Sequence, residues 1–282
     1  MGGLDYGLFC KAIDELKNKC TALSNTHLIE YSLPDSSDVK KNAAIYKVLT
    51  SAKLVLKDST LYLTRKYGYD FDDPKGKELY PHTFVSRLLS QKVGNCKSMS
   101  YLYKILATEL QAKAWISTAP MHFYIKNRNK KQGFYNTELT MGEFPTDVEI
   151  ANTGYISTEA MVNRLYMDTL SMQQSVAMCM QDLARASVRL FGYRHFTFTQ
   201  QCVDKCLQHY PNYVFAHILK ARLSKERYSP NASAENKQAM EQNYLHLLNL
   251  GYRPMPQKNY QNWLQSLEEG KRDQLQPLYG GR

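Results

Sequence analysis

Residues 93–140 constrain the fold of this chain more than any other stretch. They contain the segments VGNCKSMSYLYKILATEL, APMHFYIK and GFYNTELT, in that order. The first segment has apolar residues spaced by three and four, which is typical of a helix with one face toward a core. The other two show the alternation of half-buried strands and are separated by a loop rich in turn residues. The stretch therefore predicts a helix followed by two antiparallel strands.

A cysteine stands at the expected start of this helix. Asn95 is a good N-cap residue, so the helix should begin beside Cys96. The unpaired N–H groups of a first helical turn stabilise a thiolate, and they can also bind an oxyanion. The sequence thus indicates Cys96 as a nucleophile and its backbone amide as an oxyanion donor. The simpler alternative is a small buried hydrophobic residue, as free cysteines often are.

The two strands carry a histidine and a carboxylate. His122 alternates with apolar neighbours and is expected to point away from the apolar side. If the hairpin loop centres on Lys130, Glu138 stands directly opposite His122. A carboxylate beside an imidazole fixes its tautomer and leaves the other ring nitrogen to take a thiol proton. A register shift of two residues would put Asn136 in place of Glu138, so Asn136 is the alternative third member.

Together the three segments resemble the transglutaminase-like superfamily, in particular a bacterial branch in which a G-x-C helix is followed closely by a PxHF-type strand. The resemblance covers roughly residues 80 to 145. It implies an α+β fold with a papain-like core, in which the helix bearing the cysteine packs on a small antiparallel sheet. It also implies that Cys96 is the nucleophile, His122 the general base and Glu138 the third member, where the family more often has Asp. No cofactor and no metal ion are expected.

Two functions are compatible with these residues. The resemblance implies a cysteine peptidase, amidase or acyltransferase that acts on a peptide or protein through a Cys96 thioester. The alternative is a non-catalytic module of the same fold, whose C-terminal helices bind a protein partner. The presence of Cys96, His122 and Glu138 together favours the enzyme, and the resemblance favours hydrolysis over cross-linking.

The rest of the chain is expected to add helices to this core. Helices are predicted over residues 4–23, from residues 36–38 to about 66, and from Thr83 to Leu89. After Thr140, a loop is expected to form one wall of the site and a long helix to run from Ser157 to about Leu190. We therefore predict a transglutaminase-like domain with N-terminal helices over residues 1–155, and a helical, tetratricopeptide-like region over residues 156–282.

The C-terminal region reads as paired short helices from Phe196 onward. The segment HYPNYVFAHILKARL resembles a tetratricopeptide helix pair with Ala216 as the small packing residue, although no clean 34-residue repeat is present. Such pairs usually bind protein partners. Cys202 and Cys206 share one helix face without zinc-site spacing and are expected in the core. The acids between Asp70 and Asp73 lack EF-hand spacing, so calcium is not expected.

Composition excludes several other classes. The net charge is +10, from 36 basic and 26 acidic residues, but the basic residues are spread along the chain and no aromatic basic motif accompanies them. Nucleic-acid binding is therefore not expected. No run of eighteen apolar residues exists, so no membrane span is expected. The N-terminus lacks the pattern of an intact secretory signal, which leaves open a cytoplasmic protein or a trimmed cell-envelope or secreted one.

Overall fold

The computed structural model describes residues 5–57, 60–65, 67–77 and 80–274, and they form an α+β fold. The chain divides into two compact units, one made of Met1–Thr153 with Pro256–Arg282 and the other of Gly154–Met255. This division differs from the predicted one, 1–155 and 156–282, at its C-terminal end. The last helix returns to the first unit.

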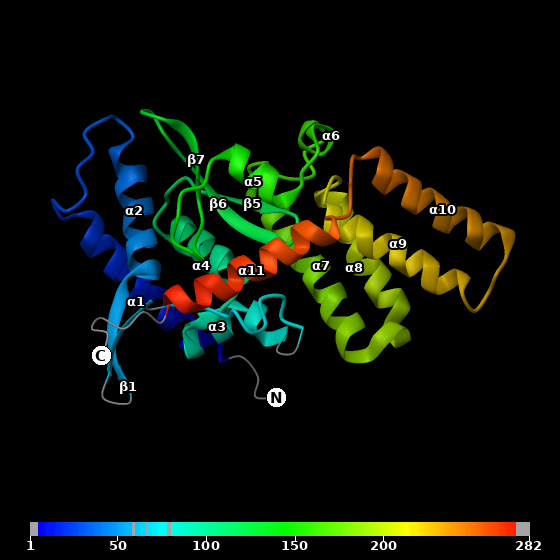
Figure 1. Ribbon diagram of the computed structural model, residues 1–282, viewed down its shortest axis with the longest axis horizontal. Coiled ribbons are helices and arrows are strands. Elements are labelled where there is room, and N and C mark those ends of the chain that lie inside the picture. Colours follow the sequence, from blue (N-terminus) through cyan, green and yellow to red (C-terminus); the bar gives the residue numbers. More distant parts are fainter. Residues whose placement is uncertain (1–4, 58–59, 66, 78–79, 275–282) are drawn as a thin grey trace. The chain divides into compact units, whose positions relative to one another are not determined.

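The centre of the first unit is a helix on a three-stranded sheet. Helix α4 (Cys96–Glu109) packs against β6 (His122–Asn129), which lies between β5 (Trp115–Ala119) and β7 (Gly133–Thr137) in an antiparallel sheet (Figure 1). The apolar face of α4 is buried, as its spacing predicted; it includes Met99, Leu102, Tyr103 and Leu106. The predicted helix and strands of this stretch are confirmed.

The register between β6 and β7 differs from the prediction by two residues. Asn129 pairs with Gly133, so the loop centres on Lys131 rather than on Lys130. Two local features close the loop in this way: the Asn129 Oδ1 accepts hydrogen bonds from the backbone amides of Lys131 (2.9 Å) and Gln132 (2.7 Å), and Gly133 has a positive φ of 79°. The predicted pairing of His122 directly opposite Glu138 is therefore wrong.

A tight hairpin connects β5 to β6 and places His122 at the first position of β6. Ala119 pairs with His122, which leaves a two-residue loop of Pro120 and Met121. Proline fixes a negative φ at the first loop position, and Met121 takes a φ of 63° at the second. A side chain in this left-handed region costs about 1–2 kcal/mol relative to ordinary backbone. The backbone directly before His122 is therefore strained and held by the strands on either side.

The N-terminal part of the first unit holds two helices and a hairpin. Helix α1 spans Tyr6–Ser24 and α2 spans Ser36–Thr50; residue Leu4 of the first predicted helix lies outside the described residues. The predicted continuation of the second helix to about residue 66 is wrong, because β1 (Ala52–Lys57) and β2 (Thr60–Arg65) pair antiparallel there. The segments AKLVLK and TLYLTR contain β-branched and aromatic residues that favour strands over helix.

A short parallel pair brings the next segment to the start of α4. Strand β3 (Gly68–Tyr69) pairs with β4 (Val93–Gly94), directly before the helix of Cys96. Between them lie the 3-10 helix η1 (Tyr80–Thr83) and α3 (Val85–Gln91), close to the predicted short helix. The loop after β3 is thereby held beside the N-terminus of α4.

Two further helices complete the first unit. The segment predicted as a loop after Thr140 contains α5 (Asp147–Gly154). Helix α11 (Gln257–Gln274) carries Tyr260 and Trp263, whose ring centroids lie 4.1 Å and 5.1 Å from the Lys75 Nζ. These cation–π contacts join the last helix to the first unit, and α11 also contacts β2.

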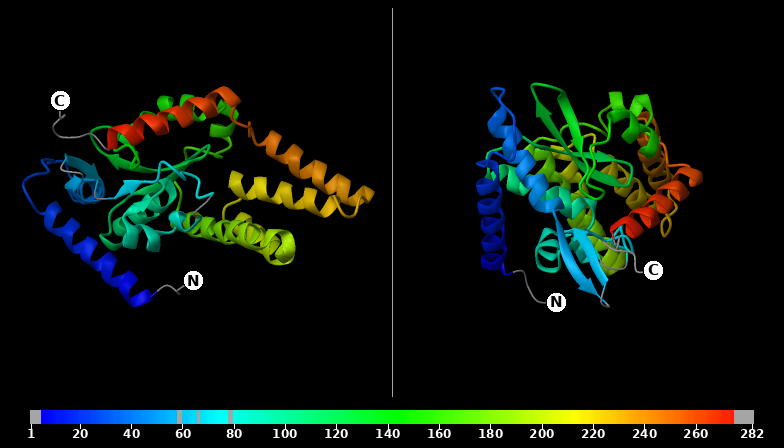
Figure 2. Two further views of the ribbon diagram at one scale, coloured as in Figure 1. Left: turned by 60° about the horizontal axis from the view of Figure 1, so that its bottom comes forward. Right: turned by 60° about the vertical axis from the view of Figure 1, so that its left-hand side comes forward.

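The second unit consists of helices, and from α7 to α10 each packs on the next along the chain (Figure 2). They are α6 (Thr158–Val162), α7 (Met172–Phe191), η2 (Gly192–His195), α8 (Phe196–His209), α9 (Val214–Tyr228) and α10 (Ala234–Asn249). The predicted single helix from Ser157 to Leu190 is wrong, because Arg164 and Met167 have positive φ values and Ser171 caps a new helix.

The small packing residues of this unit are buried as predicted. Ala216 on α9, and Cys202 and Cys206 on α8, are at most 4% exposed.

In the described part of the chain, no helix is long and apolar enough to cross a membrane.

The hydroxyl of Tyr103 connects three elements beneath the sheet. It lies 3.1 Å from the Asn42 backbone oxygen on α2, and it accepts a hydrogen bond of 3.2 Å from Asn127 Nδ2 on β6. Tyr103→Phe would leave these buried groups short of a partner, and we expect it to lower the free energy of unfolding by about 1–3 kcal/mol. Urea unfolding measures the change.

Tyr213→Phe is a matched control, because the buried Tyr213 hydroxyl has no hydrogen-bond partner among the described residues. We expect this change to be neutral or stabilising. An equal loss in both variants would contradict the role given to the Tyr103 hydroxyl.

Candidate functional site

The N-terminus of α4 is capped so that one amide is left over. The Asn95 Oδ1 accepts hydrogen bonds from the backbone amides of Lys97 (3.1 Å) and Ser98 (3.2 Å), and the Ser98 Oγ accepts one from the Asn95 amide (3.0 Å). This reciprocal capping box uses the second and third amides of the helix. None of the hydrogen bonds given by the described residues uses the amide of Cys96, the predicted oxyanion donor. It can donate to a ligand.

The structure brings Cys96, His122 and Glu138 together. The His122 Nε2 lies 3.1 Å from the Glu138 Oε1, and the ring also lies near enough to the Cys96 side chain for that side chain to raise the pKa of His122. Because Nε2 faces the carboxylate, Nδ1 is the nitrogen left for the sulfur. The His122 side chain is 24% exposed, whereas Cys96 is 6% exposed. The ring therefore lies between a buried thiol and a buried carboxylate and still reaches solvent.

The length of Glu138 compensates for the register of the strands. If the ladder of β6 and β7 is continued past Thr137, Glu138 falls opposite Tyr124, and His122 is its diagonal neighbour. Diagonal neighbours lie about 7 Å apart, and the longer side chain of a glutamate helps to span this distance. The presence of Glu instead of the Asp implied by the resemblance fits this geometry.

Asn136, the alternative third member, lies elsewhere. It pairs with Lys126 in the sheet, and its Nδ2 donates hydrogen bonds to the Pro145 backbone oxygen (2.9 Å) and the Asp147 Oδ1 (2.8 Å). Lys126 forms an ion pair with the same Asp147 carboxylate at 2.9 Å. Asn136 is thus part of a structural network that anchors α5 to the sheet.

The carboxylate of Glu138 is held by a turn of its own. Its oxygens accept hydrogen bonds from the Thr140 amide (3.0 Å), the Thr140 hydroxyl (2.7 Å) and the Met141 amide (2.7 Å). Burial by itself raises the pKa of Glu138, but the hydrogen bond and charge of His122, together with these donors, lower the pKa to about 2. The carboxylate is therefore ionised and fixed in orientation.

The electrostatics of His122 favour its charged form. Burial by itself lowers the pKa of the ring, but hydrogen bonds to Cys96 and Glu138, and negative charge on both, raise the pKa of His122 to about 10. The ring consequently keeps two protons at neutral pH. This is the form that an imidazole base has after it takes a proton from a thiol.

Neighbouring residues tie the two halves of the site together. Lys97 follows Cys96 in the chain, and Phe123 follows His122. The Lys97 Nζ lies 5.2 Å from the centroid of the Phe123 ring, so a cation–π contact connects the helix of Cys96 to the strand of His122. Tyr69 on β3 pairs with Gly94, two residues before Cys96. Burial, with negative charge at Cys96 and Glu138, raises the pKa of Tyr69 well above its usual value, so its phenol stays protonated.

Sequence reasoning missed both Tyr69 and the capping role of Ser98. The spacing of Asn95 and Ser98 was a usable signal, since reciprocal caps join residues three apart. Tyr69 gives no such signal, because only the pairing of β3 with β4 places it near Cys96.

No group of three or more His, Cys, Asp or Glu side chains suited to a metal ion occurs within the described ranges. Comparisons with protein-family models, curated proteins and solved structures find no match to this chain. The assignment of a function consequently depends on the geometry of Cys96, His122 and Glu138.

The charge of Glu138 should be measurable at the His122 ring. We expect Glu138→Gln, which removes the charge but keeps the length, to lower the pKa of His122 from about 10 toward the ordinary 6.5. NMR titration of labelled histidine measures this. Glu143→Gln is the matched control, because Glu143 is exposed and bridges Glu138 only through the backbone. Identical His122 titrations in wild type and Glu138→Gln would contradict the ion pair.

The same pair predicts how stability varies with pH. The lowered pKa of Glu138 contributes stability that is present above pH 4.5 and is lost as the pH falls toward 2. The raised pKa of His122 contributes stability that is present below pH 6.5 and is lost as the pH rises through about 10. The free energy of unfolding of wild type should therefore exceed that of Glu138→Gln by the largest amount between pH 4.5 and 6.5. Urea unfolding at a series of pH values measures this difference. A difference that does not change with pH would contradict the coupling.

Proposed function

We propose that this chain is a cysteine-dependent enzyme with a papain-like, transglutaminase-like core, which hydrolyses or transfers an amide-linked acyl group of a peptide or protein. The observation that supports this most strongly is the His122 ring between the Cys96 thiol and the Glu138 carboxylate, 3.1 Å from the latter. A nucleophile beside a base that is itself oriented by a third group is the signature of covalent acyl transfer. The packing of α4 on β6, with Cys96 at the helix N-terminus, also supports such a core.

In the proposed first step, the Cys96 sulfur attacks the carbonyl carbon of the amide and forms a C–S bond. The proton removed from the thiol is held at Nδ1 of the His122 ring, which carries two protons at neutral pH, while Glu138 holds Nε2. The negative charge that develops on the carbonyl oxygen is stabilised by the Cys96 amide. The C–N bond then breaks as His122 returns the proton to the leaving amine, and a thioester remains.

In the second step, water or an amine attacks the thioester. His122 takes a proton from the attacking group, the C–S bond breaks, and the thiol is restored. Water gives hydrolysis and an amine gives transfer, from the same intermediate.

Reaction of the cysteines with iodoacetamide tests this function. We expect Cys96, although buried, to be alkylated near neutral pH faster than the exposed Cys179, because the charged His122 ring lies beside the Cys96 side chain. His122→Ala should slow the reaction at Cys96 by a factor of about 10² or more. Peptide mapping by mass spectrometry gives both rates in one sample, with Cys179 as the internal reference. Labelling of Cys96 no faster than Cys179, with no effect of His122→Ala, would rule out the proposed enzyme.

Cys96→Ala should abolish turnover with little change in folding, since it replaces a small side chain with a smaller one. A substrate for this assay can be sought with acyl electrophiles and a library of peptides and cell-wall fragments. Turnover at the wild-type rate in Cys96→Ala would show that the thiol is not the nucleophile.

A non-catalytic scaffold is the second candidate. In the second unit, α7 exposes apolar side chains at spacings of four and seven residues, which places them on one face: Met172, Val176, Leu183 and Leu190. Apolar faces of this kind occur where a protein partner binds. An unreactive Cys96 in the alkylation experiment would favour this candidate over the enzyme.

A further inference from the structure

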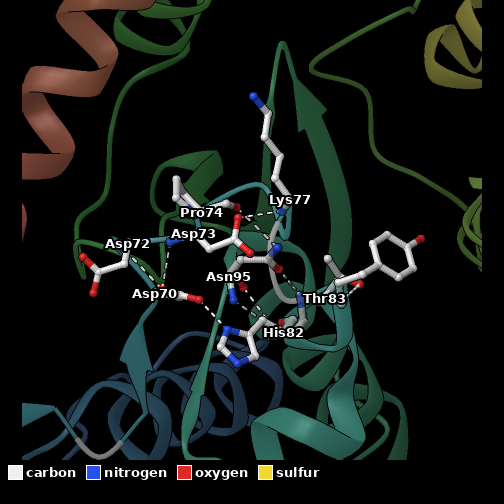
Figure 3. A network of polar contacts seen from close by, with 10 residues as sticks. Asp70, Asp72, Asp73, Pro74, Lys77, His82, Thr83 and Asn95 are labelled. Atoms are coloured by element: carbon white, nitrogen blue, oxygen red, sulfur yellow. Dashed lines mark hydrogen bonds and ion pairs between the residues drawn. The ribbon is translucent and has the colours of Figure 1, made fainter. Parts of the chain in front are cut away.

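A second buried acid–imidazole pair lies beside the helix of Cys96. Asp70 and His82 are 8% and 9% exposed, and the His82 Nδ1 pairs with the Asp70 Oδ2 (Figure 3). Asp70 directly follows β3, and His82 lies in η1. The proposed reaction uses neither side chain. A buried pair of polar side chains adds little stability relative to well-packed apolar residues, so its place in the structure calls for another explanation.

Asp70 orders the loop that follows β3. Its Oδ1 accepts hydrogen bonds from the backbone amides of Asp72 (3.2 Å) and Asp73 (3.0 Å), which closes a turn. Its own amide donates to the Gly94 backbone oxygen at 2.8 Å. The same residue therefore holds His82 through its side chain and the segment before Cys96 through its backbone.

His82 contacts the cap of α4 through its backbone. The His82 carbonyl oxygen accepts a hydrogen bond of 3.0 Å from the Ser98 Oγ, the atom that caps the Asn95 amide. On the other side of the cap, the Asn95 Nδ2 donates to the Pro74 backbone oxygen at 3.4 Å, as Figure 3 shows. A continuous set of contacts thus leads from the Asp70 carboxylate to the residues on either side of Cys96.

The packing at this point leaves no free space. A Cβ atom added to Gly94 would lie 2.3 Å from the Ser98 Oγ, 3.0 Å from the Leu88 Cδ1 and 3.4 Å from the His82 oxygen. Close-packed interiors transmit small displacements instead of absorbing them. A movement of the His82 backbone would therefore move Ser98, and with it the start of α4.

We infer that Asp70 and His82 are positioning residues for the reaction at Cys96. They fix the first turn of α4, so that the thiol meets the His122 ring and the Cys96 amide faces the bound carbonyl. This inference rests on the proposed function. Displacement of a reacting group by about 1 Å can lower a rate by about 10², so a loss of this anchor should be visible in the chemistry of Cys96.

A purely stabilising role would give the opposite result at Cys96. Cys96 and Cys20 are both buried in the first unit, at 6% and 0% exposure. If the pair only stabilises the fold, its loss opens the unit and both thiols are labelled faster. If the pair positions Cys96, its loss slows labelling at Cys96 while Cys20 stays protected.

The experiment compares iodoacetamide labelling in full-length variants by quantitative peptide mapping. For His82→Leu we expect the rate at Cys96 to fall about tenfold or more, with Cys20 unlabelled. His82→Asn should restore the rate to within about threefold, because its amide nitrogen can donate to Asp70 in place of Nδ1. Asp72→Asn is the control for a change elsewhere in this network, since it alters an exposed side chain in the loop after β3, and we expect no change in the Cys96 rate.

If His82→Leu does not fold, Ser98→Ala breaks the same set of contacts at its other end and should also slow Cys96. The positioning role would be overturned if Cys96 is labelled fast in wild type and equally fast in the folded His82→Leu or Ser98→Ala variant. That result would leave the proposed function intact. If iodoacetamide labels Cys96 of the wild-type protein no faster than Cys179, both the positioning role and the proposed function are overturned.

Discussion

The contact between the Glu138 carboxylate and the His122 ring is the interaction on which the site depends. At 3.1 Å, it fixes which ring nitrogen faces the acid and therefore which one faces the sulfur. The buried Glu138 carboxylate can stay ionised and orient the ring because it accepts three further hydrogen bonds, from the amide and hydroxyl of Thr140 and the amide of Met141. Without these donors, burial would favour the neutral form of Glu138. The His122 ring would then lose the negative charge beside it that raises its pKa.

The start of α4 supplies the second requirement. A helix begins with unpaired amides, and here the Asn95 side chain satisfies the two that follow Cys96. None of the hydrogen bonds given by the described residues uses the Cys96 amide itself. The sulfur and this amide are then side by side at the same end of the helix. The anchor formed by Asp70 and His82 adds precision to a cap that would form locally without it.

Much of the central core could be predicted from the sequence because its signals are local. The helix start at Cys96 follows from Asn95 and the apolar spacing, and the strand of His122 follows from alternation. The register was wrong because the turn depends on the Asn129 side chain and the backbone of Gly133, neither of which the alternation reveals. The break before Ser171 had a local signal in its capping box with Gln174, which was overlooked.

Other features depend on contacts between residues distant in the chain. The return of α11 to the first unit brings Tyr260 and Trp263 to Lys75, a contact that no pattern within α11 indicates. The pairing of Asp70 with His82 likewise requires β3 and η1 to be in place first. Such contacts become visible only when the elements are assembled, since propensity and periodicity describe each element by itself.

The most direct test of the central claim is an NMR titration of the His122 ring in wild type and in Cys96→Ala. If the thiol lies against the imidazole, the ring of the wild-type protein stays protonated well above neutral pH, and removal of the sulfur lowers the pKa of His122. If the two titrations coincide, the sulfur and the ring do not meet, and the account of this site as a thiol–imidazole–carboxylate centre is wrong.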